Sequence, residues 1–148
     1  MPRHEERKFL PYSPEQLFNL VIDIEKYPQF IPWCTAIRIR KRSETEILSD
    51  VIVGFKGITE RFSCRLMPNA HEKRVDVTYE NGPFKYLKNR WIFEKSDHGC
   101  IVDFYVDFEF RSVILQKIMG LVFTEAVKRM VSAFETRASA LYGPTNDE

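Results

Sequence analysis

The chain has 148 residues, a length that predicts a single domain able to bury about 70% of the surface that its unfolded state exposes. Charged residues make up 29% and leave a net charge of +1, which excludes a bulk field that would attract DNA, RNA or an anionic membrane. The aromatic content of 14%, with 12 Phe, indicates extensive apolar packing, an apolar ligand, or both. We expect residues 1–148 to form one domain with a polar tail at 143–148.

The N-terminal part is predicted to hold an edge strand followed by two short helical segments. Residues 5–10 form the expected strand. Residues 13–16, Ser-Pro-Glu-Gln, place Ser at a helix cap, Pro at the first helical position and Gln three residues after the cap, which is the pattern of a capping box. This helix should end near Glu25. A second short turn should stop before Pro28 or Pro32, because the residue before proline avoids the helical region.

From residue 35 the hydrophobic period changes from about 3.6 to 2, which predicts an antiparallel meander. The expected strands are residues 36–41, 47–55, 58–67, 74–80, 84–95 and 100–110. The last strand alternates most clearly, with apolar residues from Val102 to Phe110 on one face. In the strand before it, the alternation places Trp91 on one face of the sheet and Phe84 and Tyr86 on the other. A β-bulge between them would change this assignment, so the face on which Phe84 and Tyr86 lie stays open.

Residues 112–141 contain no proline and predict a helix of roughly 45 Å. Its apolar face is wide and consists of Leu115, Met119, Val122, Phe123, Ala126, Val127, Met130, Phe134, Ala138 and Leu141. The order of elements predicts an α+β fold in which a curved antiparallel sheet wraps around this helix. Because a curved sheet cannot follow a straight helix along its whole length, we expect a tapering cleft at one end.

The sequence contains no pattern typical of a catalytic or metal site. His4, His71 and His98 fall in the N-terminal segment and in two expected turns, away from apolar faces, where catalysis is not favoured. Cys34 could be a reactive thiol or a small buried hydrophobe. The three cysteines form no CxxC pair, so we expect no disulfide, no metal and no cofactor. Non-enzymatic function is the hypothesis that follows.

The N-terminus lacks the apolar segment of a secretory signal, and no run of about 18 apolar residues occurs. We therefore expect a cytoplasmic protein that does not bind DNA. One local basic feature suggests an alternative function. Arg38, Arg40 and Arg42 alternate on one strand, as Arg61 and Arg65 do on another. Such a stripe could contact phosphates of RNA or of anionic lipids, or could be a solvated face paired with neighbouring Glu and Asp.

Residues 21–34, which include the motif YPQFIPWC, resemble the coenzyme Q-binding START-like family within the polyketide cyclase/dehydrase superfamily. Three further stretches agree with this resemblance. They are residues 11–13, residues 82–87 leading to Trp91 and Phe93, and residues 107–110 together with 126–138 of the last helix. The similarity extends from about Arg7 to Leu141.

The resemblance implies a helix-grip fold of the START and Bet v 1 kind, with a tunnel that holds a lipid with an isoprenoid tail. It also implies non-catalytic binding of ubiquinone, delivery of it to the respiratory electron-transport chain in cellular respiration, and contact with the inner-membrane surface. A bacterial branch of the family is a ribosome-association toxin, which would bind the large ribosomal subunit and inhibit translation initiation. A polyketide cyclase or dehydratase is a third hypothesis. The shared motifs do not choose between the first two.

Transferred to this chain, the resemblance implies ligand-contacting residues on four segments. The nine residues expected to contact the ligand are Phe30, Trp33, Phe84, Tyr86, Trp91, Phe108, Met119, Phe123 and Met130. Residues 27–34 would form the rim of the tunnel or would instead pack to fix the entry of the next strand. Trp33, Lys85 and Tyr86 are the expected hydrogen-bond donors to the carbonyl groups of a quinone. Ligand identity, tail length and oligomeric state stay open.

Overall fold

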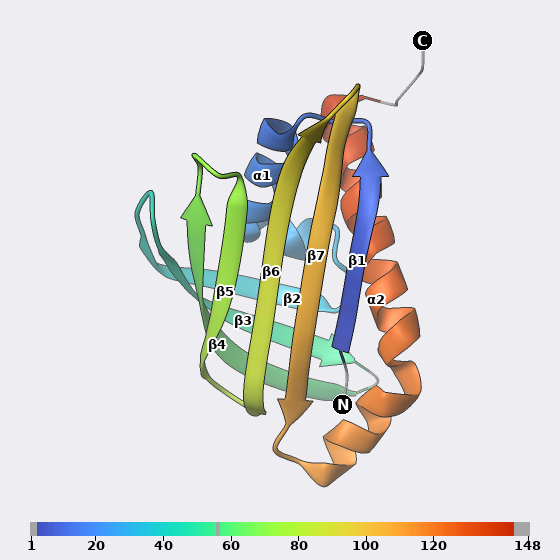
Figure 1. Ribbon diagram of the computed structural model, residues 1–148. Helices are drawn as coiled ribbons and strands as arrows, with labels where there is room; N and C mark the ends of the chain where they lie inside the picture. The colour runs from blue at the N-terminus through green and yellow to red at the C-terminus, as the bar shows by residue number, and fades with distance from the viewer. Residues whose placement is uncertain (1–2, 56, 144–148) are drawn as a thin grey trace.

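The computed structural model describes residues 3–55 and 57–143; residues 144–148 of the expected tail lie outside this range. The elements in chain order are β1 (Arg3–Leu10), α1 (Pro14–Ile22), η1 (Ile24–Gln29), β2 (Cys34–Arg42), β3 (Ile47–Phe55), β4 (Ile58–Asn69), β5 (Arg74–Asn81), β6 (Phe84–Ser96), β7 (Gly99–Phe110) and α2 (Val113–Tyr142) (Figure 1). The strands form one antiparallel sheet in the order β1-β7-β6-β5-β4-β3-β2. The predicted fold class is confirmed.

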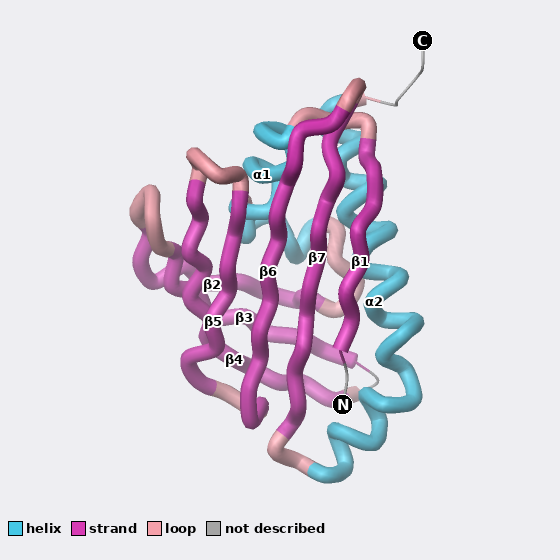
Figure 2. The backbone as a smooth tube through the Cα atoms, viewed as in Figure 1, coloured by secondary structure: helices cyan, strands magenta, loops and turns pink. Residues whose placement is uncertain are grey.

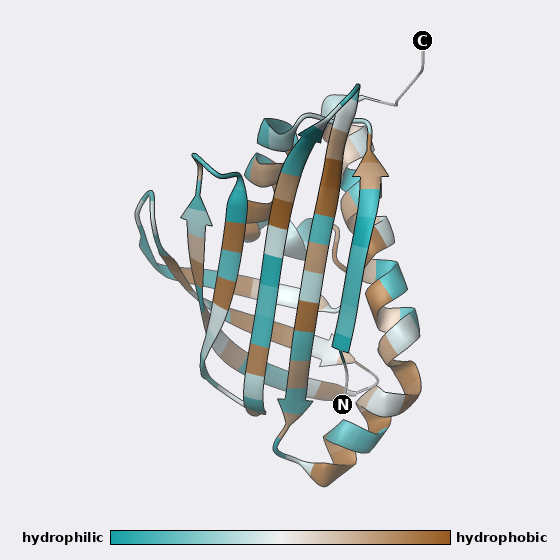
Figure 3. Cartoon of the chain, viewed as in Figure 1, coloured by the Kyte–Doolittle hydropathy of each residue, from teal (hydrophilic) through white to brown (hydrophobic). Residues whose placement is uncertain are grey.

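The sheet curves so that β2, β3 and β4 cross behind the longer strands, and both helices lie on its concave side (Figures 1 and 2). The period-2 alternation appears as bands of hydropathy along the strands (Figure 3), and apolar residues of β3, β4 and β7 line the space on the concave side. A meander with one apolar and one wet face needs a cover on the apolar face. Helices α1 and α2 provide it.

The start of α1 is the predicted capping box. Ser13 Oγ accepts a hydrogen bond from the Gln16 amide at 3.1 Å, and Gln16 Oε1 accepts one from the Ser13 amide at 3.0 Å. The second helical segment, η1, continues through Pro28 and ends at Gln29, before Pro32, which is the second of the two predicted stops. Pro28 is tolerated since the amides of Phe30 and Ile31, and not that of residue 28, close the last turn on the Tyr27 carbonyl.

Helix α2 begins where the sequence predicted, and Ser112 caps it: its Oγ accepts a hydrogen bond from the Leu115 amide at 3.2 Å. Its C-terminal part is held to the N-terminal segments of the chain: the Tyr142 hydroxyl donates to the Gln16 carbonyl at 2.9 Å, and the Tyr12 hydroxyl donates to the Gly143 carbonyl at 3.1 Å. The expected apolar face is buried or half-buried except at its end. Leu141, in the last turn, is 50% exposed.

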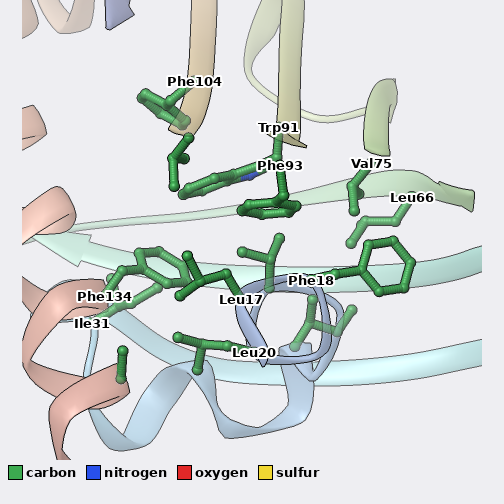
Figure 4. Close-up of a cluster of buried hydrophobic side chains, with 14 of the residues drawn as sticks. Leu17, Phe18, Leu20, Ile31, Leu66, Val75, Trp91, Phe93, Phe104 and Phe134 are labelled. Carbon is green, nitrogen blue, oxygen red and sulfur yellow. The ribbon is translucent and has the colours of Figure 1, made fainter. Parts of the chain in front are cut away.

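The densest packing lies between α1, the sheet and the C-terminal part of α2 (Figure 4). Its buried side chains include Leu17, Phe18, Leu20, Leu66, Val75, Trp91, Phe93, Phe134 and Ala138. Rings contact one another across elements here: the Phe134 centroid lies 5.0 Å from that of Trp91 and 5.2 Å from that of Phe30. This cluster closes one end of the space between sheet and helices.

Candidate ligand-binding cavity

The space between the concave face of the sheet and the helices is filled at one end and hollow at the other. A cavity of about 340 Å³ lies between the concave face of the sheet and α2. Strands β2 to β7 contribute its walls, η1 and the end of α1 contribute one side, and α2 contributes Leu115 to Phe134. The lining is mainly aliphatic and aromatic, because each strand presents to it the apolar set of its period-2 alternation.

Seven of the nine residues expected to contact a ligand line this cavity. They are Trp33, Phe84, Trp91, Phe108, Met119, Phe123 and Met130. They come from four separate parts of the chain, so the sheet and α2 bring them together only in the folded state. Phe108 and Phe123 contact each other across the cavity wall, with ring centroids 5.6 Å apart.

Phe30 does not line the cavity. Its ring packs edge-on against Tyr27, with centroids 5.8 Å apart, and lies under the guanidinium of Arg137, 5.2 Å from the ring centre. It therefore covers the C-terminal part of α2 from outside, where it borders a shallow surface groove with Lys128 and Arg129. The prediction placed Phe30 and Trp33 on the same side, but the tight turn after η1 separates them.

Tyr86 also lies elsewhere, on the convex face of the sheet. A β-bulge between Phe84 and Tyr86 inserts one residue against β7. Because the bulge resets the alternation, Phe84 faces inward in phase with Trp91, and the Tyr86 hydroxyl contacts Asp107 Oδ1 at 3.2 Å outside. Lys85 pairs with Glu109 on the outer side as well, at 3.1 Å. Two of the three expected quinone donors are thus on the wrong face, and Trp33 remains.

The lining contains polar side chains that the sequence analysis missed. Ser49, Glu60 and Asn89 all line the cavity. Each lies at an inward-facing position of its strand. The period-2 alternation therefore predicts that these side chains face the cavity, although their polar residue type does not. Asn89 Nδ2 donates to the Tyr105 carbonyl at 2.8 Å. Ser49 differs, because it is fully buried and its Oγ has no hydrogen-bond partner among the described residues.

A buried hydroxyl without a partner loses its hydrogen bond to water and gains nothing in return, which costs about 1–3 kcal/mol. Ser49 is placed by β3, where its Cα partners are Ile39 on β2 and Cys64 on β4. Glu60 is four positions along the same ladder, opposite Val53, and so lies about 13 Å from Ser49. The two polar groups are too far apart to share a proton.

The thiols in the lining are not activated. Burial raises the pKa of Cys34 to about 11 and that of Cys64 to about 12, so both are protonated at neutral pH. Cys34 therefore acts as a small buried hydrophobe, the second of the two interpretations. Burial also raises the pKa of Tyr27, whose hydroxyl donates to the Val21 carbonyl, far above its ordinary value. Neither group supplies a nucleophile or base at neutral pH.

His4 corrects one expectation. Its ring is half-buried against Phe104, with centroids 6.1 Å apart, and contacts Glu6 at 2.8 Å, so this histidine does touch an apolar side chain. It does not line the cavity. In the described ranges 3–55 and 57–143, no three His, Cys, Asp or Glu side chains converge to form a metal site. None of the helices described is long and apolar enough to span a bilayer.

The arginines of the expected basic stripe are mostly paired. Asp50 is only 4% exposed and accepts from Ser63 Oγ at 2.6 Å, with Arg40 Nε at 3.2 Å and Arg61 at 3.4 Å. Arg65 pairs with Glu46 and Glu80, and Arg42 pairs with Glu25. Arg38 alone of the five has no ion pair within the described part of the chain. Most of the outer face is therefore a solvated, charge-balanced surface.

A curved antiparallel sheet wraps around a long C-terminal helix, and an apolar cavity lies between them. This arrangement defines the helix-grip class of START and Bet v 1-like proteins. The chain belongs to the polyketide cyclase/dehydrase and lipid transport family, which it matches over residues 10–135. The predicted resemblance is confirmed.

Two curated relatives carry different names. The chain is 39% identical to the ribosome association toxin RatA of Rickettsia prowazekii, over 90% of this chain and 94% of that protein. It is 32% identical to the mitochondrial coenzyme Q-binding protein COQ10 homolog B of Xenopus laevis, over 95% of this chain and 59% of that protein. The family relationship is therefore to proteins that bind a quinone and to proteins that associate with ribosomes.

Solved structures support the fold. The 18 kDa protein CC1736 of Caulobacter crescentus is 34% identical, with a TM-score of 0.78 over 97% of this chain and 100% of that one. A START superfamily protein of Mycobacterium smegmatis has a TM-score of 0.78 at 18% identity, over 94% and 98% of the two chains. The Zhui aromatase/cyclase of Streptomyces has a TM-score of 0.81 at 12% identity, over 93% of each. Binding proteins and enzymes thus share this architecture.

Proposed function

We propose that this protein binds ubiquinone or a similar polyprenyl lipid in the cavity, catalyses no reaction on it, and supports its delivery to the respiratory electron-transport chain. The observation that carries the proposal is the cavity itself, which is lined by apolar side chains from the sheet and α2. The name of the COQ10 relative gives the ligand class. The spacing of the polar side chains supports binding over catalysis, since no acid and base face each other.

The driving force for such a ligand is the removal of apolar surface from water, at about 25 cal/mol per Å². Each isoprene unit adds about five carbons, so a few units supply ample free energy without covalent chemistry. The volume of about 340 Å³ is near the lower end of the roughly 300–1,000 Å³ typical of small-molecule sites. It accommodates a ring headgroup and the first part of a tail, and a longer tail would extend between α2 and the strands.

The test uses purified protein and a cavity-filling variant. Organic extraction followed by mass spectrometry should recover a polyprenyl quinone, and added short-chain ubiquinone should raise the melting temperature. Val51 and Val53 point into the cavity, so Val51→Phe/Val53→Phe should abolish both results. The control is Leu48→Phe/Ile52→Phe, which also introduces two phenylalanine rings, but on the opposite face of β3. Recovery of no lipid and no thermal shift in the native protein would refute the proposal.

A second candidate function is association with the large ribosomal subunit, followed by inhibition of translation initiation. The RatA relative, 39% identical over most of both chains, favours it. Arg38 is the cation of the basic stripe that is not committed to an ion pair within the described residues. Co-sedimentation with large subunits in a sucrose gradient should be weakened by Arg38→Glu and unaffected by Lys95→Glu, a charge reversal on β6. Absence of the native protein from the subunit fractions would dismiss this function.

A further inference from the structure

The first turns of α2 expose large apolar side chains to solvent. Val113 is 69% exposed, Ile114 is 71% exposed and Leu121 is 88% exposed. They are three of the five exposed large hydrophobic residues in the part of the chain that the structure describes. Other side chains of the same turns, among them Leu115 and Met119, line the cavity. This segment is therefore apolar on the side that faces the ligand site and also on the side that faces water.

The same segment carries positive charge only. Between Glu109 and Glu125 the sequence has no acidic residue, while Arg111 and Lys117 are both exposed. Neither cation has an ion pair with a described residue; the Arg111 Nε donates to the Phe84 carbonyl at 3.1 Å. Exposed leucine and isoleucine beside uncompensated basic residues are the composition of a helix that lies in a lipid–water interface. Elsewhere on the same helix, basic and acidic groups are mixed, as in the pair of Arg129 with Glu125 at 3.1 Å.

This part of α2 also has little attachment to the rest of the fold. The three fully buried residues of α2, Val127, Phe134 and Ala138, all lie in its C-terminal part. The contacts of the N-terminal part include the bond from the Phe110 amide to Gln116 Oε1 at 2.8 Å and ring packing of Phe123 on Phe108. In Figures 1 and 3 these turns lie at the end of the molecule where β7 finishes, remote from α1, with apolar colour along them. The segment forms one wall of the cavity and is itself open to a partner.

We propose that residues 111–124 dock on the surface of a bilayer that contains anionic lipids. Val113, Ile114 and Leu121 enter the boundary between headgroups and acyl chains, and Arg111 and Lys117 contact lipid phosphates. This inference rests on the proposed lipid-binding function, because docking would place the cavity wall against the source of its ligand. Charge argues for lipid over a second copy of this chain. A two-fold symmetric interface would bring the same cations together without acidic partners.

The experiment measures binding of the full chain to sedimenting vesicles of phosphatidylcholine and phosphatidylglycerol in a three-to-one ratio. We expect the native protein to bind, and Ile114→Glu/Leu121→Glu to reduce the partition coefficient by at least about tenfold. Lys117→Glu should have a smaller effect, and added salt should weaken binding of the native protein. Leu141→Glu is the matched control, since this residue is a half-exposed leucine at the other end of the same helix.

Folding of the variants is checked by circular dichroism and by melting temperature. The substituted leucine and isoleucine side chains are exposed, and Glu at position 114 lies in the first turn of α2, where it interacts favourably with the helix dipole, so the variants should fold. The docking proposal is overturned if the native protein does not bind vesicles, or if Leu141→Glu loses as much binding as Ile114→Glu/Leu121→Glu. It is also overturned if the native protein is a dimer that the double substitution dissociates, or if this variant loses ribosome binding and keeps vesicle binding.

Failure of docking can be separated from failure of the lipid-binding function. Quinone presented in detergent micelles reaches the cavity without a bilayer. If the native protein binds that quinone but not vesicles, the docking surface is refuted and the proposed function stands. If it binds vesicles but never quinone, the proposed function is refuted and the surface stands. The result expected of Ile114→Glu/Leu121→Glu is normal binding of micellar quinone together with weak binding to vesicles.

Discussion

The two halves of α2 face the same sheet but have different structural roles. The C-terminal half presses Phe134 and Ala138 into a filled core with α1 and η1. The N-terminal half borders a cavity of about 340 Å³ with side chains that are only half-buried, including Met119 and Phe123. One continuous amphipathic helix thus stabilises the fold at one end and forms a binding site at the other.

The difference arises from what lies opposite each half. At the filled end, α1 and η1 lie between α2 and the strands and bring Leu17, Leu20 and Tyr27 into the gap. At the hollow end, side chains of β2 to β7 and of α2 face one another across the cavity. A wide apolar helix face is therefore compatible with either outcome. The intervening elements decide which outcome occurs.

The largest expected effect comes from removing one phenylalanine ring in each half. Phe134→Ala deletes a ring that contacts Tyr27, Phe30 and Trp91 and should lower the free energy of unfolding by about 3–5 kcal/mol. Phe123→Ala removes a half-buried ring that packs on Phe108, so it should cost less than about half as much. Urea denaturation of both variants tests the comparison. Equal losses of stability would show that the two halves are packed alike.

A second pair of substitutions compares two buried serines on neighbouring strands. Ser63→Ala removes the 2.6 Å hydrogen bond to the buried Asp50 carboxylate and should destabilise the protein by about 1–3 kcal/mol. Ser49→Ala removes a buried hydroxyl without a partner, so it should leave the free energy of unfolding unchanged or raise it.

The ligand supplies a further readout for Ser49. Its hydroxyl is closed off from the cavity space, so Ser49→Ala should leave the affinity for short-chain ubiquinone unchanged. Binding of a hydrocarbon of similar size should also be unchanged. Titration calorimetry with both ligands tests this prediction. Equal loss of affinity for the two would assign Ser49 a role in cavity shape instead.

The smallest expected effect is on the charged outer face, in its dependence on pH. The hydrogen bond from Ser63 and the guanidinium groups of Arg40 and Arg61 hold the pKa of Asp50 below its ordinary value. A carboxyl whose folded-state pKa is lowered stabilises the fold above the unfolded-state pKa of about 3.9, and this stabilisation is lost as pH falls through the lowered value. Asp50→Asn should therefore lose more stability at pH 6 than at pH 2. An equal loss at both values would contradict the assignment.

Local patterns were sufficient to predict most of the framework. The Ser13 capping box, the alternation along β7 and the long apolar face of α2 each follow from spacing within one element, and the structure confirms them. The facing of Tyr86 did not follow, because a bulge adds one residue without a distinctive residue type. The position of Phe30 depends on how the turn after η1 packs on α2, which is a tertiary contact.

The hollow and filled ends could not be located from the sequence for a related reason. The helical period identifies the apolar face of α2 but gives no information on whether α1 or empty space lies against it. Ser49 illustrates the same limit. A serine in an inward strand position is ordinary in sequence, and only the folded structure shows that its hydroxyl has no partner within the described residues.

The central claim, that the hollow end holds a quinone, is tested most directly by intrinsic fluorescence. The chain has two tryptophans, and both Trp33 and Trp91 line the cavity. Titration with short-chain ubiquinone should quench their emission to saturation, Val51→Phe/Val53→Phe should abolish this quenching, and Leu48→Phe/Ile52→Phe should retain it. Emission that falls without saturation, or falls equally in both double variants, would contradict the account.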